Sequence, residues 1–242
     1  MHGIELLEKG IHELNLEISE NQKKQFEEYY ELLIKKNKVM NLTAITDLDE
    51  VMIKHFLDSL LLSSVTDMNK YETVIDVGTG AGFPGIPLKI MFPHLKVTLL
   101  DSLKKRLLFL DEVINELGLD NISTIHGRAE DYGKDKEYRE KYDLCVSRAV
   151  ANLSSLSEYC IPFVKLSGKF ISYKSELSDK EINEAGKAID LLGGNINNKT
   201  IVSLPCSNIK RTFVTIEKKK NTPSNFPRKA GVPSKKPIKW GK

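Results

Sequence analysis

The stretch VIDVGTGAGFPG, from Val74 to Gly85, constrains the fold more than any other part of the chain. A short apolar segment that ends in glycines before a helical segment is typical of a nucleotide-binding turn, because glycines let the backbone approach the ligand and a helix N-terminus offers free amides. Two patterns overlap there. G-x-G-x-x-G from Gly80 is typical of dinucleotide sites, whereas D-x-G-x-G-x-G from Asp76 is typical of S-adenosylmethionine (AdoMet) sites.

Short apolar segments alternate with amphipathic segments from Tyr71 onward. We expect strands at TVIDV, KVTLL, ISTIHG, YDLCVS and GKFISYK, and two more near Ile201 and Phe213. We expect helices at GIPLKIMF, LKKRLLFLDEVINELG, Leu153–Cys160 and Asp179–Leu192. This alternation predicts a mostly parallel sheet with helices on both faces. The last two strands have no helix between them, so one of them is expected to pair antiparallel.

Residues 1–70 are predicted to be helical. SENQ, at Ser19–Gln22, is a capping box in which two side chains satisfy exposed amides at a helix start. A second helix is expected from about Asp47 to Ser64, where apolar residues recur with helical spacing. Each of these helices has an apolar stripe, so we expect them to pack against the following domain.

The C-terminal segment differs in charge from the rest of the chain. From Lys218 to Lys242 there are nine basic and no acidic residues, whereas the whole chain has 36 basic and 33 acidic ones. Such segregation is typical of a polyanion-binding segment, although a solubilising tail has the same composition. Four prolines predict that this tail is extended rather than helical. No apolar run approaches the ~20 residues of a membrane span, and Cys145, Cys160 and Cys206 form no C-x-x-C pair.

The position of Asp76 favours AdoMet over NAD or a flavin. The G-x-G-x-x-G at Gly80 begins two residues too late after the strand, so Gly85 is interpreted as completing that pattern by coincidence. A carboxylate at the strand end repels phosphates but attracts a sulfonium and an amino group. Asp101 ends the second strand, where it can accept hydrogen bonds from a ribose diol, a contact that NAD also needs. Glu130, in the loop GRAED, completes an ordered acidic series.

The loop after the fourth strand restricts which atom is methylated. Enzymes that methylate exocyclic amino groups have a [DN]-P-P-[YFW] loop there, whereas this chain has SRAVAN, at Ser147–Asn152. Methylation of carbon five of a pyrimidine needs a cysteine nucleophile, and Cys206 lies too late in the chain. Guanine N7 needs no covalent help and no base, because it has an in-plane lone pair and no proton to lose. Catalysis then reduces to orientation.

The segments DVGTGAGFPGIPLKI, HFLDSL, RAED, SRAVANL and PRKAGVPSKKPI together resemble the bacterial small-subunit ribosomal RNA methyltransferase G family, also called glucose-inhibited division protein B. The resemblance runs from Asn41 to Pro237, with Thr79 where many members have Ser. It implies N7 methylation of one guanine in the decoding-region loop of 16S rRNA, with AdoMet as donor. The expected fold is a class I AdoMet-dependent methyltransferase: a Rossmann-like, mostly parallel seven-stranded sheet with an N-terminal helical cap (1–70), an AdoMet-binding domain (71–218) and a basic RNA-binding tail (219–242).

The resemblance also implies which residues bind the cofactor. Together with the acidic series, the expected AdoMet contacts are Asp76, Gly78, Gly80, Phe83, Asp101, Ala129, Glu130 and Arg148. Arg148 ends the fourth strand, where its guanidinium can hold the AdoMet carboxylate or an RNA phosphate, or form a surface ion pair. We expect it to position the reactants, and we identify no general base.

Residues outside the cofactor motif give the candidates for RNA binding. They are Asn41, Arg128, Arg211, Arg228, Lys229 and Lys235, with the other tail lysines as phosphate contacts and Phe226 and Trp240 as stacking residues. KHFLDS places His55, Asp58 and Ser59 on one helical face. This face is interpreted either as a polar cluster that fastens the helix or as part of a lid over the cofactor. Two possible ligands are too few for a metal, so no metal is expected.

These inferences define one expected activity and its rivals. We expect a cytoplasmic, monomeric, AdoMet-dependent guanine-N7 methyltransferase that acts on 16S rRNA or a small-subunit precursor and does not bind membranes. A small-molecule methyltransferase would have no use for the basic tail. A non-catalytic RNA-binding protein that keeps AdoMet only for stability is the remaining alternative.

Overall fold

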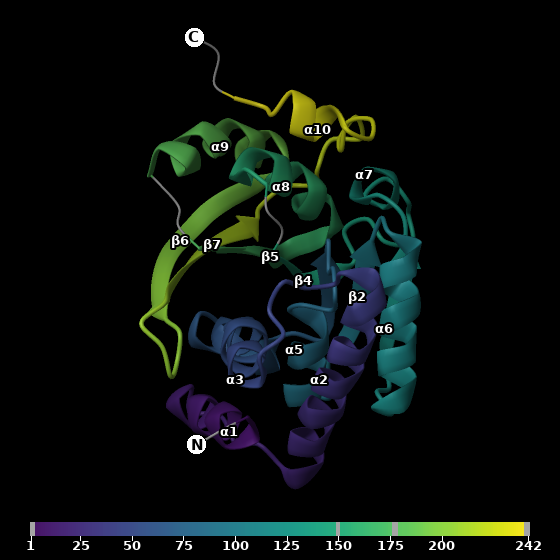
Figure 1. The fold of residues 1–242 in the computed structure, drawn as a ribbon. Coiled ribbons are helices and arrows are strands. Elements are labelled where there is room, and N and C mark those ends of the chain that lie inside the picture. Colours follow the sequence, from purple (N-terminus) through teal and green to yellow (C-terminus); the bar gives the residue numbers. More distant parts are fainter. Residues whose placement is uncertain (1–2, 149–150, 176–178, 240–242) are drawn as a thin grey trace.

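The strands form one sheet with helices on both faces (Figure 1). The computed structural model describes residues 3–148, 151–175 and 179–239. Within them the sheet has seven strands in the order β3-β2-β1-β4-β5-β7-β6. The strands are β1 (Thr73–Val77), β2 (Lys96–Asp101), β3 (Ile122–His126), β4 (Tyr142–Ser147), β5 (Val164–Lys174), β6 (Gly194–Ser203) and β7 (Lys210–Lys218). Strands β1 to β5 pair in parallel, and β7 runs antiparallel to β5 and β6. The expected α/β fold class is confirmed.

The sheet separates two apolar layers because neighbouring side chains of a strand point to opposite faces. Leu144 and Val146 of β4 join one layer, and Cys145 joins the other. The first layer packs against α1 (Ile4–Glu13), α2 (Glu20–Met40), α5 (Gly85–Met91), α6 (Lys104–Glu116) and the segment from α3 (Leu48–Val51) to η2 (Leu61–Ser64). The second packs under α7 (Ala129–Tyr132), α8 (Leu153–Cys160), the short η4 (Ile161–Phe163) and α9 (Asp179–Leu191). In Figure 1, α8 and α9 lie above the sheet and α1, α2, α3 and α5 below it.

Helix α2 fastens the N-terminal segment to the sheet. Its capping box is confirmed: the Ser19 side chain accepts a hydrogen bond from the Gln22 amide, and the Gln22 side chain accepts one from Ser19. Gln22 Nε2 also donates to the carbonyl of Ile90 over 2.8 Å, and the Tyr29 hydroxyl donates to the carbonyl of Ala81 over 2.5 Å. Residues 1–70 therefore share one core with the sheet. The domain boundary at residue 70 stays a prediction.

The helix expected from about Asp47 to Ser64 exists but changes type along its length. It comprises α3 (Leu48–Val51), the π-helical turn η1 (Met52–Leu57), α4 (Asp58–Leu60) and the 3₁₀ turn η2 (Leu61–Ser64), and a further 3₁₀ turn, η3 (Met68–Lys70), precedes β1. A π-helical turn widens the backbone spiral and is often found at functional sites. Here it carries Lys54 and His55, with Asp58 directly after it.

The strand order places a crevice between β1 and β4. Chain connections leave β1 toward β2 on one side, and β4 continues toward β5 on the other. Ligands of doubly wound sheets bind at such a switch point, beyond the carboxyl ends of the strands. The glycine loop that follows β1 and Arg148, which follows β4, both lie there.

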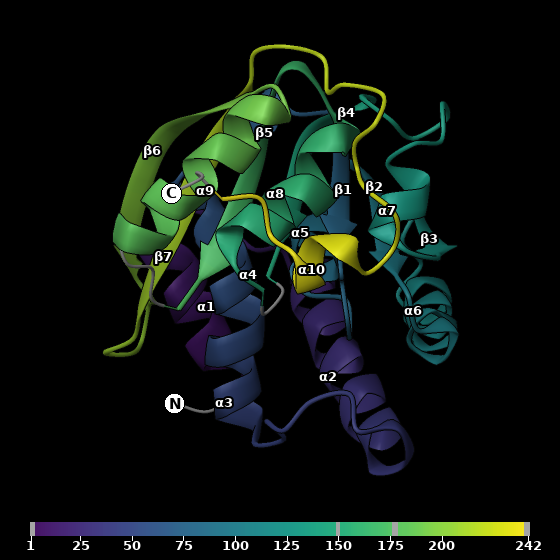
Figure 2. The same cartoon turned by 90° about the horizontal axis from the view of Figure 1, so that it is seen from above.

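The C-terminal tail packs on the body of the protein instead of extending from it. Figure 2 shows it running across the outer side of α7 and α8 and forming the short helix α10 (Val232–Lys235), where an extended chain was expected. Arg139 donates hydrogen bonds to the carbonyls of Thr222 and Phe226. Ser155 Oγ donates to the carbonyl of Pro233 over 2.7 Å. The tail is therefore an ordered part of the fold.

Candidate functional site

The loop after β1 depends on its glycines for two different reasons. Gly80 has φ +64°, which side chains with a Cβ rarely adopt, and a Cβ there would meet nothing within 4 Å. Gly82 has φ +101°, and a Cβ would lie 2.4 Å from the Tyr29 hydroxyl oxygen. At Gly85 a Cβ would lie 2.3 Å from Leu99 Cδ2. Gly85 is therefore required by packing, and this requirement does not depend on a dinucleotide.

Asp76 lies beneath this loop and holds it. Its Oδ2 accepts hydrogen bonds from Thr79 Oγ1 over 2.7 Å and from the Gly85 amide over 2.9 Å. Burial raises the pKa of Asp76 to about 6, although these two hydrogen bonds oppose the rise. The residue has no exposed surface, and within the described residues Oδ1 has no hydrogen-bond partner. Direct contact with AdoMet stays a prediction, and the structure gives Asp76 the role of fixing the loop.

Asp101 lies at the end of β2, as expected, and connects the loop to α6. Its Oδ2 accepts hydrogen bonds from the Gly80 amide over 2.9 Å and from Arg106 Nη1 over 3.3 Å, and its Oδ1 accepts one from the Leu103 amide over 2.8 Å. A carboxylate offers about four acceptor positions. Two hydrogen bonds from a ribose diol would therefore require Gly80 or Arg106 to release Asp101.

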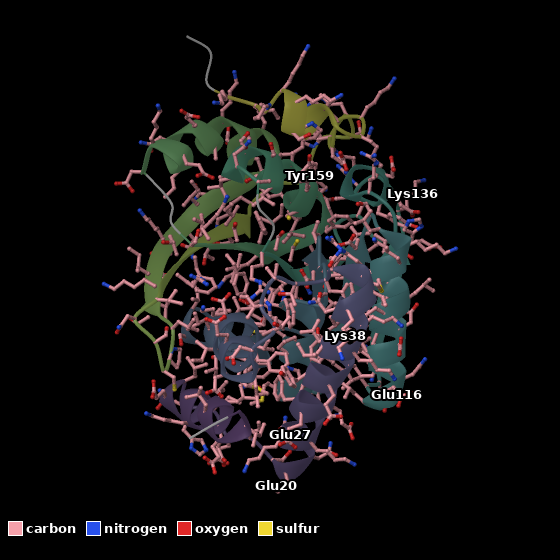
Figure 3. The ribbon with its side chains drawn as sticks, in the orientation of Figure 1. Glu20, Glu27, Lys38, Glu116, Lys136 and Tyr159 are labelled. Carbon is pink, nitrogen blue, oxygen red and sulfur yellow. The ribbon has the colours of Figure 1, made fainter. Side chains whose placement is uncertain are left out.

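A hollow of about 250 Å³ lies beside the end of β3, and we call it the β3-side hollow. Its lining consists of Val77, Gly78, Leu100, Asp101, Ser102, Gly127, Arg128, Ala129, Glu130, Leu156, Tyr159, Gly231 and Ser234. The apolar side chains of Val77, Leu100, Ala129 and Leu156 in this lining suit a flat base, and Asp101 adds a carboxylate to it. Glu130 Oε1 accepts a hydrogen bond from the Gly231 amide over 2.8 Å, so the tail forms one wall. Tyr159 lies beside that wall (Figure 3).

A second hollow, of about 640 Å³, lies over the glycine loop, and we call it the glycine-loop hollow. It shares Gly78, Asp101 and Ser102 with the β3-side hollow, so the two are continuous. Phe83 lines it, with the His55 ring stacked at 4.6 Å between centroids and the Arg148 guanidinium 5.1 Å from the Phe83 centroid. The expected cofactor residues other than Asp76 therefore line one continuous crevice.

Arg148 and His55 are fixed by partners on other elements. Arg148 Nη1 donates to Asp58 Oδ2 over 2.9 Å, and Arg211 Nε donates to Asp58 Oδ1 over 2.6 Å. His55 Nε2 lies 2.7 Å from Thr43 Oγ1. Burial, assisted by the positive charge of Arg148, lowers the pKa of His55 to about 3, so the imidazole is neutral at physiological pH. The structure supports the interpretation of KHFLDS as a fastening cluster.

The candidates for RNA binding have different surroundings. Arg128 is exposed at the β3-side hollow, and Asn41 ends α2 in a left-handed conformation with φ 49°. Lys229 and Lys235 are exposed on the tail. Arg228 instead donates to Glu158, whose side chain is 1% exposed. RNA binding by all of these residues stays a prediction, although Glu158 already holds the guanidinium of Arg228.

Lys218 was grouped with the phosphate-binding lysines, and the structure contradicts this. Its side chain is 1% exposed and its Nζ donates to the Ile161 carbonyl over 2.9 Å and lies 3.1 Å from Glu140 Oε1. Burial lowers the pKa of Lys218 to about 8. The positive charge of Lys218 is therefore paired with Glu140 inside the fold. Trp240, the expected stacking residue, lies outside the described residues.

Cys206 is far from the crevice. Its Sγ lies 3.8 Å from the Leu6 carbonyl oxygen of α1, and burial raises the pKa of the thiol. Among the described residues, no group of three or more His, Cys, Asp and Glu side chains is placed to hold a metal ion. In the same part of the chain, no helix is both long and apolar enough to cross a bilayer.

The crevice offers the kinds of surface that AdoMet needs. The β3-side hollow has apolar walls, Asp101 supplies a carboxylate to both hollows, and the glycine loop supplies a backbone that a ligand can approach closely. A mostly parallel seven-stranded sheet with this crevice at its switch point defines the chain as a class I AdoMet-dependent methyltransferase.

Comparisons with known proteins identify the family. The sequence profile described as rRNA small subunit methyltransferase G matches residues 22–210. The chain is 54% identical to the ribosomal RNA small subunit methyltransferase G of Desulforamulus reducens, with 96% of this chain and 97% of the relative covered. It is 49% identical to that of Listeria monocytogenes, with 96% of each covered. The chain belongs to the rRNA small subunit methyltransferase G family.

Solved structures agree on the fold. The chain superposes on a mutant of MtNAS with a TM-score of 0.54 and 16% identity, over 90% of this chain and 86% of that one. It superposes on the StiE O-MT structure with a TM-score of 0.53 and 15% identity, over 74% and 77%. At these identities the likeness concerns the fold alone.

Several residues at the crevice carry no sequence signal of their own. Tyr159 and Leu156 come from α8, and Gly231 and Ser234 come from the tail. The PRKAGVPSKKPI segment was interpreted through its charge, which points to RNA. Within this segment, Gly231 and Ser234 were the residues that could have indicated a turn at the crevice.

Proposed function

We propose that this protein transfers a methyl group from AdoMet to N7 of one guanine in the decoding-region loop of 16S rRNA. Family membership supports an rRNA substrate. The observation that carries the proposal is the meeting of two different hollows at Arg148 and His55, which line both the glycine-loop hollow and a basic hollow beyond it. A cationic site next to the donor end of the crevice suits an RNA nucleotide.

The chemistry requires orientation and no proton transfer. The N7 lone pair forms the new bond to the methyl carbon of AdoMet while the carbon–sulfur bond breaks, which leaves neutral S-adenosylhomocysteine and a positively charged 7-methylguanine. His55 stays neutral because its pKa is lowered to about 3, so it adds no charge that would repel this product. Arg148 and His55 form the wall between the hollows, with Phe83 packed against both on the side of the glycine loop, and their role is to keep donor and acceptor in line.

The residue assignments are part of this proposal. Gly78, Gly80, Phe83, Ala129 and Glu130 contact AdoMet, with Asp101 on the ribose and Asp76 acting through the loop. Arg148 lies between donor and acceptor, where it can hold the AdoMet carboxylate or an RNA phosphate. Arg128, Arg211, Lys229 and Lys235 contact RNA, with Asn41 near the target. The enzyme works in the cytoplasm as a monomer without a metal, on rRNA or a small-subunit precursor.

The direct test uses small-subunit rRNA from cells that lack the enzyme. The purified protein is incubated with methyl-labelled AdoMet and this RNA, and the labelled nucleosides are separated. We expect label in 7-methylguanosine at one position, and none when the RNA comes from cells that contain the enzyme. Label at another atom, or in no nucleoside, would refute the proposal.

A basic tail is expected of an RNA methyltransferase and not of a small-molecule one. Removing the whole tail would not test this difference alone, because other contacts would be lost with it. Truncation at residue 218 would take Arg228 from buried Glu158 and remove a wall of the β3-side hollow. Replacing the exposed Lys229, Lys235 and Lys236 with alanine leaves those contacts in place. This triple variant should keep its affinity for AdoMet and methylate rRNA more slowly at low RNA concentration.

A further inference from the structure

The hollow beyond Arg148 is built from elements that are far apart in sequence. It has a volume of about 570 Å³, and we call it the basic hollow. Lys54 and Asp58 come from the segment around η1, Arg148 follows β4, Lys174 ends β5 and Arg211 comes from β7. It opens at the same edge of the sheet as the cofactor crevice, and Arg148 and His55 form the partition between them.

The charges at the back of this hollow do not cancel. Asp58 is 2% exposed, and a buried carboxylate requires a paired cation. Arg148 alone meets this requirement through its hydrogen bond of 2.9 Å, yet Arg211 binds the other oxygen of the same carboxylate over 2.6 Å. Two guanidiniums on one carboxylate leave one positive charge uncompensated at a polar, solvent-accessible wall.

Arg211 keeps more hydrogen-bond donors for a ligand than Arg148, which also donates to the Lys54 carbonyl over 3.3 Å and lies 3.4 Å from His55 Nδ1. An arginine has five N–H donors in a planar fork. Arg211 uses Nε on Asp58 and reaches the Lys210 carbonyl with Nη1 over 3.4 Å, and among the described residues Nη2 has no acceptor. The side chains of Arg148 and Arg211 are 20% and 19% exposed. They are thus partly desolvated and held in place, which strengthens their interaction with an anion.

We propose that Arg148 and Arg211, positioned by Asp58, bind a backbone phosphate of the RNA strand beside the target guanosine. The inference rests on the proposed function and specifies how the acceptor is held. A phosphodiester accepts bidentate hydrogen bonds from a guanidinium fork. The carboxylate of AdoMet is the other available anion, and Arg148 lines the glycine-loop hollow as well as the basic hollow. Arg211 lines the basic hollow and not the glycine-loop hollow, so it is the arginine that separates the two ligands. A fixed phosphate orients the nucleotide without reading its sequence.

Arg211→Gln tests the phosphate contact, since glutamine can still donate to Asp58. The affinity for unmethylated small-subunit rRNA is measured over a range of salt concentrations. Each phosphate contact contributes about 0.7 to the slope of log affinity against log salt for a single strand. We expect Arg211→Gln to lower that slope by about 0.7 and to raise KM for RNA about tenfold, with AdoMet affinity unchanged. Arg211→Lys should restore the slope but only part of the affinity.

A matched control removes the same charge elsewhere. Lys96 begins β2, at the opposite edge of the sheet, and pairs with exposed Glu72. Lys96→Gln should change neither the slope nor KM. Asp58→Asn keeps both cations but no longer fixes them, so it should raise KM for RNA while the slope stays near that of the wild type.

Two results would overturn the inference: an unchanged slope in Arg211→Gln, or an equal change in Lys96→Gln. A loss of AdoMet affinity in Arg211→Gln would also contradict it, because that would place the arginine in the donor site. These binding measurements do not depend on which atom is methylated. If the wild type produced no 7-methylguanosine but Arg211→Gln still lowered the slope of log affinity against log salt, the proposed function would be refuted and the phosphate site would be supported.

Discussion

At the scale of single residues, Asp76 shows how a motif carboxylate acts without surface exposure. It was expected to attract the positive groups of AdoMet by contact, but its side chain is buried and holds Thr79 and Gly85. Charge acts over several ångströms in a low-dielectric interior. Asp76 fixes the loop by hydrogen bonds, and we propose that it also favours a cationic ligand through its field.

The pKa of Asp76 predicts how stability changes with pH. Burial raises it from 3.8 to about 6, so the folded state binds this proton more tightly than the unfolded state does. Below about pH 4 both states are protonated and burial carries no charge penalty. As pH rises to about 6, the wild type should lose up to about 3 kcal/mol relative to Asp76→Asn. Denaturant unfolding of both proteins from pH 4 to 7.5 measures this difference, and parallel curves would contradict it.

The charge of Asp76 should also appear in AdoMet binding. Because the carboxylate ionises near pH 6, wild-type affinity should rise between pH 5 and 7, whereas that of Asp76→Asn should stay flat. S-adenosylhomocysteine, which lacks the sulfonium charge, should show a smaller rise. Calorimetric titration at each pH gives all three affinities. Equal pH dependence in wild type and variant would show that Asp76 acts only through hydrogen bonds.

Residue roles could be predicted where the relevant partner is local. Gly80 lies in the motif and Asp101 ends the next strand, and both line the crevice as expected. The role of Lys218 could not be predicted because it depends on Glu140, which is remote in sequence. Arg228 is similar, since its partner Glu158 lies 70 residues away. A count of charges cannot show which of them the fold neutralises.

At the scale of elements, the tail contributes both to the protein surface and to the lining of a hollow, although its basic composition indicates only a surface role. Its outer surface carries the exposed Lys229 and Lys235, while Gly231 and Ser234 line the β3-side hollow from within. The prolines predicted an extended tail, and the structure departs from this at α10, a helix of four residues. The packing could not be predicted from the tail alone because its anchors, Arg139 and Glu158, lie on other elements.

The ion pair between Arg228 and Glu158 should support cofactor binding. Arg228→Met leaves a carboxylate that is 1% exposed with fewer partners, which should destabilise the tail by about 1–3 kcal/mol. Because Gly231 and Ser234 line the β3-side hollow, AdoMet affinity should fall several-fold. Lys229→Met, the adjacent exposed lysine, removes the same charge and should leave AdoMet affinity unchanged. Equal affinities in the two variants would contradict this role of the tail.

The segment from α3 to η2 shows the limit of periodicity as a guide. Its apolar spacing predicted a helix over the correct residues, and the helix exists there. The π-helical turn at Met52–Leu57 could not be predicted, because one extra residue per turn barely alters the apolar stripe. That turn directs Lys54, His55 and Asp58 toward the partition between the hollows.

At the scale of the whole molecule, the strand order arranges the reaction. The β3-side hollow, the glycine-loop hollow and the basic hollow follow one another along the carboxyl edge of the sheet, from β3 to β7. Shared residues join each hollow to the next. The parallel sheet and its switch point were predictable from alternating strands and helices. The basic hollow was not, because it forms only when β7 lies beside β5.

The central claim is that the methyl group leaves the crevice past Arg148 into the basic hollow. A crystal structure of the protein with AdoMet bound tests it most directly. We predict that the adenine lies in the β3-side hollow against Leu156, the ribose at Asp101, and the methyl group at the partition formed by Arg148 and His55, facing the basic hollow. A methyl group that points away from that hollow, or an adenine bound in it, would contradict the account.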